Sequence, residues 1–227
     1  MFKLLSTANP KIQKGTKLGY LSFILHLAPA DLSGYNTCPK ATAGCKASCL
    51  NTAGRGGMFR KGETTNTIQK ARIRKTEYFY KDRTNFLADL KADIVKAIKM
   101  ADKLNLKPVF RLNGTSDLSW EKYGIIEQFP QVQFYDYTKV LGRKIAHLPN
   151  YHLTFSRAEN NEADCLRALT EGMNVATVFD RIPEGVFSAD ETDLRFLDGK
   201  KGVIGLKAKG RAKKDYSGFV IRIQEAA

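Results

Sequence analysis

The sequence predicts an α/β fold: an open or partial (β/α) barrel of about six mostly parallel strands, in a single domain over residues 1–227. Apolar segments of strand length alternate with segments of helical periodicity along most of the chain. The strand segments are apolar on nearly every residue, which is typical of a parallel sheet covered on both faces. Six or so strands are too few to close an eight-stranded barrel. We therefore expect an open sheet.

Six apolar segments are expected to form the sheet, and a seventh near the C-terminus is a further candidate strand. In chain order they are 18–27, 107–113, 132–139, 152–156, 174–180, 202–208 and 218–223. Helical periodicity covers residues 65–104, with an expected break near Asp82–Asn85. Its second half carries an apolar stripe at a spacing of three to four residues. The stripe consists of Leu87, Leu90, Ile94, Ile98 and Ala101.

Two shorter helices and one long loop complete the expected elements. A helix is expected at 119–128, where Ser119 is a plausible N-cap. A second helix is expected to begin at Asn161 and to end at Gly172, because glycine readily adopts a left-handed C-cap. Residues 31–62 are polar and rich in Gly and Cys, and we expect them to form a loop after the first strand.

The net charge of +14 is unevenly distributed along the chain. Residues 1–76 contain 13 Lys and Arg against two acids, and residues 198–215 contain seven against two, whereas residues 77–197 have a net charge of −2. Solubility needs a net charge of only about 2–8. The excess favours a nucleic acid or a phosphorylated ligand as partner, bound by the first third and by 200–214, with a solvated basic surface as the alternative. No RNP-like strand pair, zinc-finger helix or helix-turn-helix is present.

The apolar pattern excludes membrane insertion. The longest apolar run, residues 18–30, is interrupted by His26 and is shorter than the roughly 20 residues of a spanning helix. The first four residues do not begin a signal peptide. We therefore expect a soluble cytoplasmic protein with no membrane partner.

Three of the four cysteines lie within twelve residues. Cys38, Cys45 and Cys49 have the spacing C-x6-C-x3-C and follow the first strand, so they are expected at the ligand-binding end of the sheet. Three thiolates bind three corners of a [4Fe–4S] cluster and leave the fourth iron for another ligand. Zinc is the alternative metal, and unligated redox thiols are a third interpretation. Nearby cations are expected to hold the thiols deprotonated: Lys40, Lys46, Arg55 and Arg60.

Two residues are candidate fourth ligands. Cys165 lies in the first turns of the helix that opens at Asn161, where it would face the ligand-binding end of the sheet. However, its i, i+4 spacing with Leu169 also fits a buried core thiol. His26 lies near the end of the first strand, where a structural role is the alternative.

Polar residues follow the carboxyl end of each predicted strand, where parallel α/β proteins bind ligands. Asp136 and Lys139 follow one strand, and Arg157 and Glu159 follow the next. We expect these four to contact a substrate. Ordinary capping and loop chemistry is the alternative explanation for any single strand end.

Several segments resemble a family of phage and plasmid proteins named gene product 88. The similar segments are 38–50, 51–57, 111–117 and 135–139, within a resemblance that covers roughly residues 18–210. The resemblance implies a protein of a mobile element, located in the host-cell cytoplasm.

A more distant similarity is to radical S-adenosylmethionine enzymes, which carry three cysteines after the first strand of a partial barrel with the spacing C-x3-C-x2-C. This similarity implies a [4Fe–4S] cluster with one open iron, and S-adenosylmethionine as a second cofactor. The polar segment after the second strand would hold that cofactor, with Arg111, Asn113, Ser116 and Asp117 as its binding residues.

Two functions remain open at this point. In the first, the protein is an iron–sulfur enzyme that acts at the open iron on a small anionic or nucleic-acid substrate. In the second, it is a non-catalytic nucleic-acid-binding protein whose metal, zinc or a cluster, only shapes the loop at 31–62.

Overall fold

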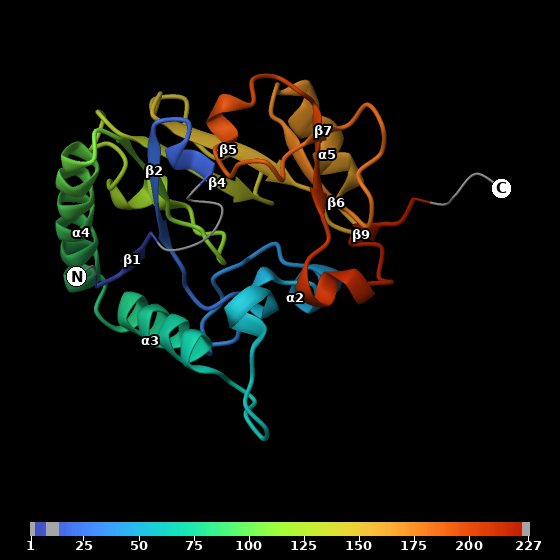
Figure 1. The fold of residues 1–227 in the computed structure, drawn as a ribbon, viewed down its shortest axis with the longest axis horizontal. Coiled ribbons are helices and arrows are strands. Elements are labelled where there is room, and N and C mark those ends of the chain that lie inside the picture. The colour runs from blue at the N-terminus through green and yellow to red at the C-terminus, as the bar shows by residue number, and fades with distance from the viewer. Residues whose placement is uncertain (1–2, 8–13, 224–227) are drawn as a thin grey trace.

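A mostly parallel, open sheet forms the centre of the protein (Figure 1). The structure is a computed structural model that describes residues 3–7 and 14–223. Within these residues nine strands form one sheet in the order β1-β2-β3-β4-β5-β6-β8-β7, and β9 pairs with β6. The strands are β1 Leu5–Ser6, β2 Tyr20–Leu25, β3 Lys107–Arg111, β4 Gln133–Thr138, β5 Tyr151–Ser156, β6 Val175–Phe179, β7 Phe187–Ser188, β8 Val203–Lys207 and β9 Val220–Ile221.

The order of the strands confirms the predicted α/β class and the open sheet. Strands β2, β3, β4, β5, β6 and β8 run parallel to one another, β7 and β9 are also paired parallel, and among the described strands only β1, which pairs with β2, is antiparallel. All seven predicted strands are present. The two-residue strands β1 and β7 were not predicted, because so short a segment has no periodicity and pairs only where the fold brings it to an edge.

The longer α-helices of the described residues connect the strands. Helices α3 (Thr67–Lys81) and α4 (Arg83–Lys103) connect β2 to β3, and α5 (Glu162–Thr170) connects β5 to β6. The predicted break is confirmed: Asp82 ends α3 and caps α4 by accepting a hydrogen bond from the backbone N–H of Asn85 at 3.2 Å. The described residues contain no helix long and apolar enough to cross a membrane.

The helix predicted at 119–128 is wrong. Only a 3₁₀ turn, η3 (Trp120–Tyr123), forms there, and it ends at Gly124 in the left-handed conformation with φ +63°. Ser119 makes no capping hydrogen bond. Glu121 instead forms a buried ion pair with Arg143. Tertiary contacts therefore override the local helical pattern.

The main core lies between the sheet and the helices α3 and α4. Phe23, Phe110 and Phe134 come from adjacent strands and stack in a row, with ring centroids 5.5 and 5.3 Å apart. They belong to the same buried cluster as Phe79 of α3 and Phe86 of α4. This packing fixes β2, β3 and β4, whose carboxyl ends carry the polar residues of the site.

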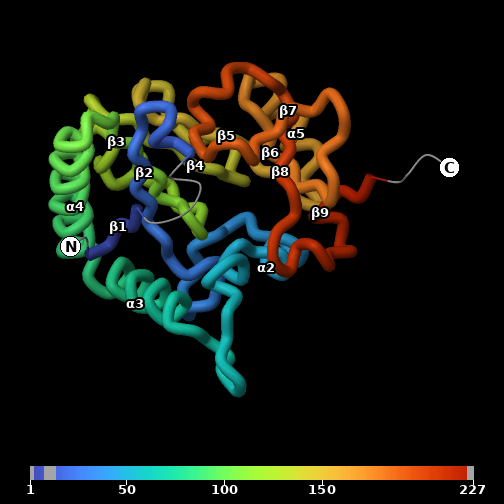
Figure 2. Tube along the Cα trace, in the orientation of Figure 1, coloured from blue at the N-terminus to red at the C-terminus, as the bar shows by residue number. Residues whose placement is uncertain are grey.

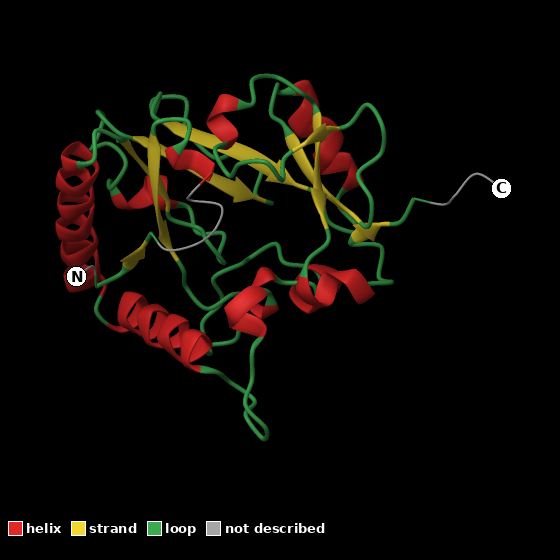
Figure 3. Cartoon of the chain, viewed as in Figure 1, coloured by secondary structure: helices red, strands yellow, loops and turns green. Residues whose placement is uncertain are grey.

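The loop predicted at 31–62 contains short helices. These are α2 (Ala43–Ala47) and the 3₁₀ helices η1 (Leu50–Thr52) and η2 (Gly54–Gly57). The 3₁₀ helix η5 (Gly210–Lys214) follows β8 and packs against η1 beneath the sheet (Figure 3). Between η2 and α3 the chain projects away from the body of the protein (Figure 2). The site therefore joins segments from the two ends of the sequence.

Candidate functional site: a cysteine-lined pocket

A pocket of about 230 Å³, here called the thiol pocket, opens at the carboxyl ends of the parallel strands. The segment after β2 lines one side, and the segments after β3, β4, β5 and β8 line the rest. The lining residues that matter below are Cys38, Cys45, Cys49, Arg111, Asn113, Ser116, Asp117, Tyr137, Lys139, Val178, Asp193, Leu206, Lys207, Lys209, Ala212 and Phe219. The structure thus brings the predicted cysteine loop and the predicted strand ends together.

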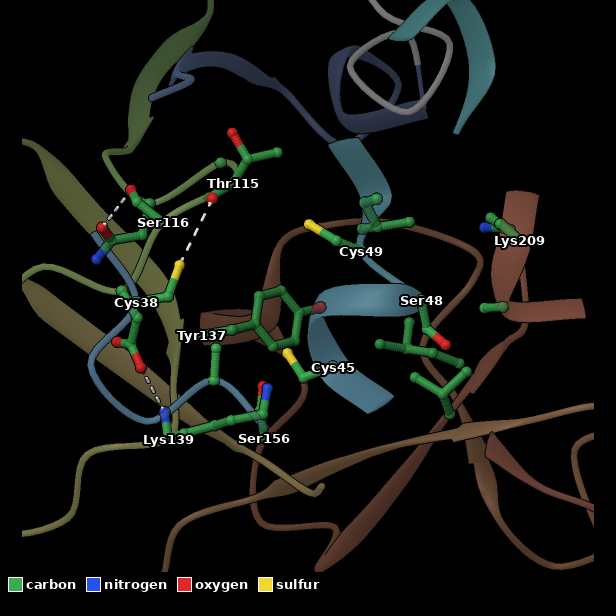
Figure 4. Close-up of a pocket in the computed structure, with 18 of the residues that line it drawn as sticks. Cys38, Cys45, Ser48, Cys49, Thr115, Ser116, Tyr137, Lys139, Ser156 and Lys209 are labelled. Carbon is green, nitrogen blue, oxygen red and sulfur yellow. Dashed lines mark hydrogen bonds between the residues drawn. The ribbon is translucent and has the colours of Figure 1, made fainter. Parts of the chain in front are cut away.

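The three clustered cysteines point into this pocket from different parts of one segment (Figure 4). Cys38 precedes α2, Cys45 lies on α2, and Cys49 is the N-cap of η1. All three are free thiols and are partly buried. They also line a second pocket of about 280 Å³, here called the outer pocket, together with Phe59 and Arg211. The thiols can therefore be approached from two sides.

Backbone groups fix two of the thiols. The sulfur of Cys38 accepts a hydrogen bond from the N–H of Ala30 at 3.3 Å, and that of Cys49 accepts one from the N–H of Asn51 at 3.5 Å. Burial raises the pKa of Cys38, and it raises the pKa of Cys49 to about 11. In the absence of a bound cation, burial thus favours the protonated thiols.

The cations expected to ionise the thiols lie at the surface. Lys40, Lys46, Arg55 and Arg60 are all exposed. The cation whose charge acts on a thiol is instead the half-buried Arg72 of α3, which lowers the pKa of Cys49 against the larger effect of burial. Its guanidinium donates to Oδ1 of Asn51 at 2.5 Å. Sequence reasoning missed Arg72 because it lies in a helix more than twenty residues away.

The thiols share one pocket without meeting at one point. In the described part of the chain, no three His, Cys, Asp or Glu side chains are grouped closely enough to hold a single metal ion. A tetrahedral zinc ion with Zn–S bonds of about 2.3 Å would hold its thiolates roughly 3.8 Å apart. An iron–sulfur cluster bonds each thiolate to a different iron atom, and so it suits a wider arrangement. As placed in the described residues, the thiols therefore do not form a ready-made site for a single metal ion.

Glu159 positions the helix that carries Cys45. Its carboxylate accepts hydrogen bonds from the N–H of Gly44 at 2.7 Å and from the hydroxyl of Thr42 at 2.6 Å. A Cβ at Gly44 would lie 2.2 Å from Oγ of Ser217 and 2.9 Å from the Glu159 carboxyl. Glu159 does not line the thiol pocket itself. It acts on the pocket by fixing α2.

Arg157 also lies outside the lining, where it anchors the chain before β9. Its guanidinium donates to the carbonyl oxygens of Gly218 at 2.7 Å and Phe219 at 3.1 Å. This contact holds the Phe219 ring at the pocket, where Lys139 lies 5.7 Å from the ring centroid. Lys139 is thus the one of the four expected substrate contacts that lines the pocket.

Asp136 lies buried beneath the pocket. It is 1% exposed and accepts hydrogen bonds from the N–H of Asn113 at 2.7 Å and the hydroxyl of Tyr151 at 3.0 Å. Burial raises its pKa to about 7. The side-chain oxygen of Asn113 in turn accepts from Ser116 and from the indole of Trp120, at 2.9 and 3.1 Å. Asp136 therefore supports the turn that shapes the pocket wall.

All four expected cofactor-binding residues line the pocket: Arg111, Asn113, Ser116 and Asp117. The guanidinium of Arg111 donates to Asp193 at 2.8 Å and lies 4.7 Å from the centroid of the Tyr137 ring. Its Nε is buried without a hydrogen-bond partner. Asp193 and Phe219 were not predicted, because only the fold places them beside residues that are distant in sequence.

The two candidate fourth ligands lie elsewhere. Cys165 is buried against Phe155, Ala168 and Val175, and its thiol donates to Oδ1 of Asn161 at 3.4 Å. His26 lies 3.4 Å from the hydroxyl of Ser6, and burial and the charge of Arg72 lower its pKa to about 3, so the ring is neutral. Neither residue lines the thiol pocket.

The fold and the site define a parallel α/β protein with three free cysteines in a pocket at the carboxyl ends of its strands. The sequence model of the family described as Gene product 88 matches residues 3–223, which is nearly the whole chain. The chain belongs to the Gene product 88 family, and the predicted resemblance to it is confirmed. No curated protein and no solved structure matches the chain significantly. The similarity to radical S-adenosylmethionine enzymes stays a prediction.

Proposed function

We propose that this protein binds a [4Fe–4S] cluster through Cys38, Cys45 and Cys49, and that it acts as an enzyme on a ligand bound beside the open iron. One observation carries the proposal: the three cysteines of one segment all line the thiol pocket, whereas Cys165 is packed in a core cluster. Three thiolates leave one iron of a cubane without a protein ligand. That iron would supply a Lewis-acidic and redox-active centre at the pocket.

The pocket residues would bind and orient the ligand. The ammonium of Lys139 provides positive charge for an anionic group, and Arg111, paired with Asp193, provides the buried Nε–H that has no hydrogen-bond partner. Val178, Leu206 and Phe219 provide apolar walls that exclude water, which strengthens polar interactions inside the pocket. The elements around them are fixed by Glu159, Arg157 and Asp136, which act as positioning residues.

S-adenosylmethionine is one candidate for the ligand at the open iron. Three features support this proposal. The parallel strands from β2 to β6 lie side by side in the order of the sequence, the three cysteines follow β2, and a polar segment follows β3. In radical S-adenosylmethionine enzymes the equivalent segment binds the methionine end of the cofactor. Asn113, Ser116 and Asp117 would have that role in this protein.

Anaerobic reconstitution with iron and sulfide tests the proposal. The expected product has about four irons and four sulfides per chain and a broad visible absorption that dithionite bleaches. Cys38→Ala, Cys45→Ala and Cys49→Ala should each lose most of the iron. Cys165→Ala is the matched control: it should retain the iron and lose only about 1 kcal/mol of stability from core packing. A colourless protein that binds zinc, or full iron in all three variants, contradicts the proposal.

Addition of S-adenosylmethionine to the reduced protein tests the second cofactor. Binding of its polar groups to the open iron should change the electron paramagnetic resonance spectrum of the cluster. The change should be lost in Asp117→Ala and retained in Asp102→Ala, a control at an exposed position of α4. An unchanged spectrum at saturating cofactor would assign the open iron to a different ligand.

A further inference from the structure

We propose that single-stranded nucleic acid crosses the mouth of the thiol pocket and places one base inside it. The inference rests on the proposed function, because it names the substrate class of the same pocket. It starts from two acid-free segments, the cysteine segment (residues 38–62) and the lysine segment (residues 207–214). Each contains five Lys or Arg and no Asp or Glu.

The fold joins these two segments into one cationic track. Helix η5 of the lysine segment packs against η1 of the cysteine segment. The contact is close, since a Cβ at Gly210 would lie 3.1 Å from the carbonyl oxygen of Thr52. All ten cations are exposed: Lys40, Lys46, Arg55, Arg60, Lys61, Lys207, Lys209, Arg211, Lys213 and Lys214. Within the described residues, only Lys46 and Lys209 form an ion pair, with Asp31 and Asp190.

The track lies at the pocket rather than elsewhere on the surface. Lys207 and Lys209 line the thiol pocket, and Arg211 lines the outer pocket. A row of exposed cations, most of them without an ion-pair partner among the described residues, binds a phosphate backbone. Single-stranded nucleic-acid sites combine such a row with exposed aromatic rings on which bases stack. Tyr216, which is 85% exposed, and Phe59 provide such rings beside the two segments.

The pocket has the size and walls for one base. Its volume of about 230 Å³ is below the roughly 300–1,000 Å³ of sites for drug-sized ligands, which suits a single inserted group. Tyr137 and Phe219 provide aromatic surfaces, and Thr115 and Ser156 provide polar groups for the base edge. The three thiols lie at the same pocket, so an inserted base would lie beside the proposed cluster.

Fluorescence anisotropy with labelled single-stranded DNA and RNA of about 20 nucleotides tests the track. Binding should weaken steeply between about 50 and 200 mM salt. The quadruple variant Lys207→Gln, Arg211→Gln, Lys213→Gln, Lys214→Gln should reduce the slope of log affinity against log salt by up to about 3, since each phosphate contact contributes about 0.7. The charge-matched control replaces four exposed lysines away from the pocket, Lys99, Lys103, Lys122 and Lys144, with Gln. The control should keep the parental slope.

A pair of phenylalanine variants tests the inserted base. Phe219→Ala should weaken binding about 5- to 150-fold without changing the salt slope, which is the effect of one lost stacking contact of about 1–3 kcal/mol. Phe187→Ala is the control, because Phe187 also lies under a lysine, Lys201, but outside the pocket. Phe219→Leu keeps the apolar packing against η5 and β9 and should show part of the loss, which covers the case in which Phe219→Ala fails to fold.

The results separate this inference from the proposed cluster. Cys38→Ala should lose iron and still bind the oligonucleotide through the track. No binding of DNA or RNA at 50 mM salt, or equal salt slopes for the two quadruple variants, would overturn the track. Equal affinity of Phe219→Ala and Phe187→Ala, or heparin binding as tightly as the oligonucleotide, would overturn the inserted base. Whichever of the DNA and RNA oligonucleotides binds more tightly is the nucleic acid that the track prefers.

Discussion

Single residues at the strand ends divide into those that enter the pocket and those that support it, and for Asp136 and Tyr137 the pleat of β4 decides which. Side chains alternate between the two faces of a strand. In β4, Asp136 shares a face with the core residue Phe134, whereas its neighbour Tyr137 lies on the other face and lines the pocket. The cysteines and the residues from Arg111 to Asp117 could be predicted from sequence, since a loop at the strand ends faces the ligand. The burial of Asp136 follows from the alternation of side chains along β4. Its position near the end of the strand does not by itself predict that burial.

Replacing Asp136 should change how stability depends on pH. Its folded-state pKa of about 7 lies above the ordinary value of 3.8 because burial disfavours the charge, although Arg111 and Arg143 oppose this effect. The native state therefore binds more protons than the unfolded state between pH 4 and 7, and stability falls as the pH rises through that window. In Asp136→Asn this loss, about 2–4 kcal/mol in total, should be absent.

Urea unfolding of the metal-free protein at pH 4.5 and pH 7.5 measures the difference. The asparagine oxygen can accept from the Asn113 N–H as Asp136 does, and the asparagine amide can donate to the Tyr151 oxygen, which reverses the direction of the second hydrogen bond. Asp102→Asn, at an exposed position of α4, should keep the parental pH profile. A wild-type protein and an Asp136→Asn variant with parallel pH profiles would contradict a buried, protonated carboxyl.

Among the elements, α2 carries Cys45 between Cys38 and Cys49, and residues distant in sequence stabilise it. Five residues are too few for a stable isolated helix. Glu159 from the segment after β5 binds its first turn, and Asp215 from the segment after η5 bonds to Ser48 at its C-cap. Periodicity could predict α3, α4 and α5, because their apolar faces are long. It could not predict α2, whose stability comes from contacts with distant segments.

Glu159→Ala should loosen α2 and with it Cys45. Loss of the hydrogen bonds to Gly44 and Thr42 should destabilise α2 by about 1 kcal/mol, a small value because the Glu159 carboxylate is partly exposed to solvent. This corresponds to a roughly fivefold increase in the local opening of α2. Amide hydrogen exchange at Gly44 and Cys45 measures this opening in the metal-free protein, and iron loss from the reconstituted protein should accelerate with it. Glu171→Ala, which removes an exposed carboxylate paired with Arg167, should leave both measurements unchanged.

At the scale of the whole molecule, the open, mostly parallel sheet brings residues 38–57 and residues 207–219, which are distant in sequence, to one site. The order of the strands was predictable from the alternation of apolar strands and helices, since connected parallel strands tend to be neighbours. The contact between η5 and η1 was not, because charged segments of low periodicity give no signal of where they pack. The basic charge of both segments was visible in the sequence, but their union at the pocket is a property of the fold.

Removing a bound cluster should therefore destabilise the protein as a whole. A ligand present at about a hundred times its dissociation constant adds about 2.7 kcal/mol, which corresponds to a rise in Tm of roughly 5–10 °C for a domain of this size. Differential scanning calorimetry of reconstituted and chelator-treated protein under anaerobic conditions measures the shift. Cys165→Ala should show the same shift and Cys38→Ala none. Equal melting temperatures of the loaded and stripped parental protein would contradict coupling between the cluster and the fold.

The contact of η5 with the cysteine segment also sets an order of events during translation. The ribosome completes Cys49 about 160 residues before Gly210, an interval of roughly 8–32 s at 5–20 residues per second. Throughout that interval the nascent chain presents its three thiols without the wall formed by η5 and without the Asp215 bond to Ser48. Maturation of the site therefore waits until residues 210–215 have been synthesised, and a chain stalled before residue 210 would expose its thiols to oxidants in the cell.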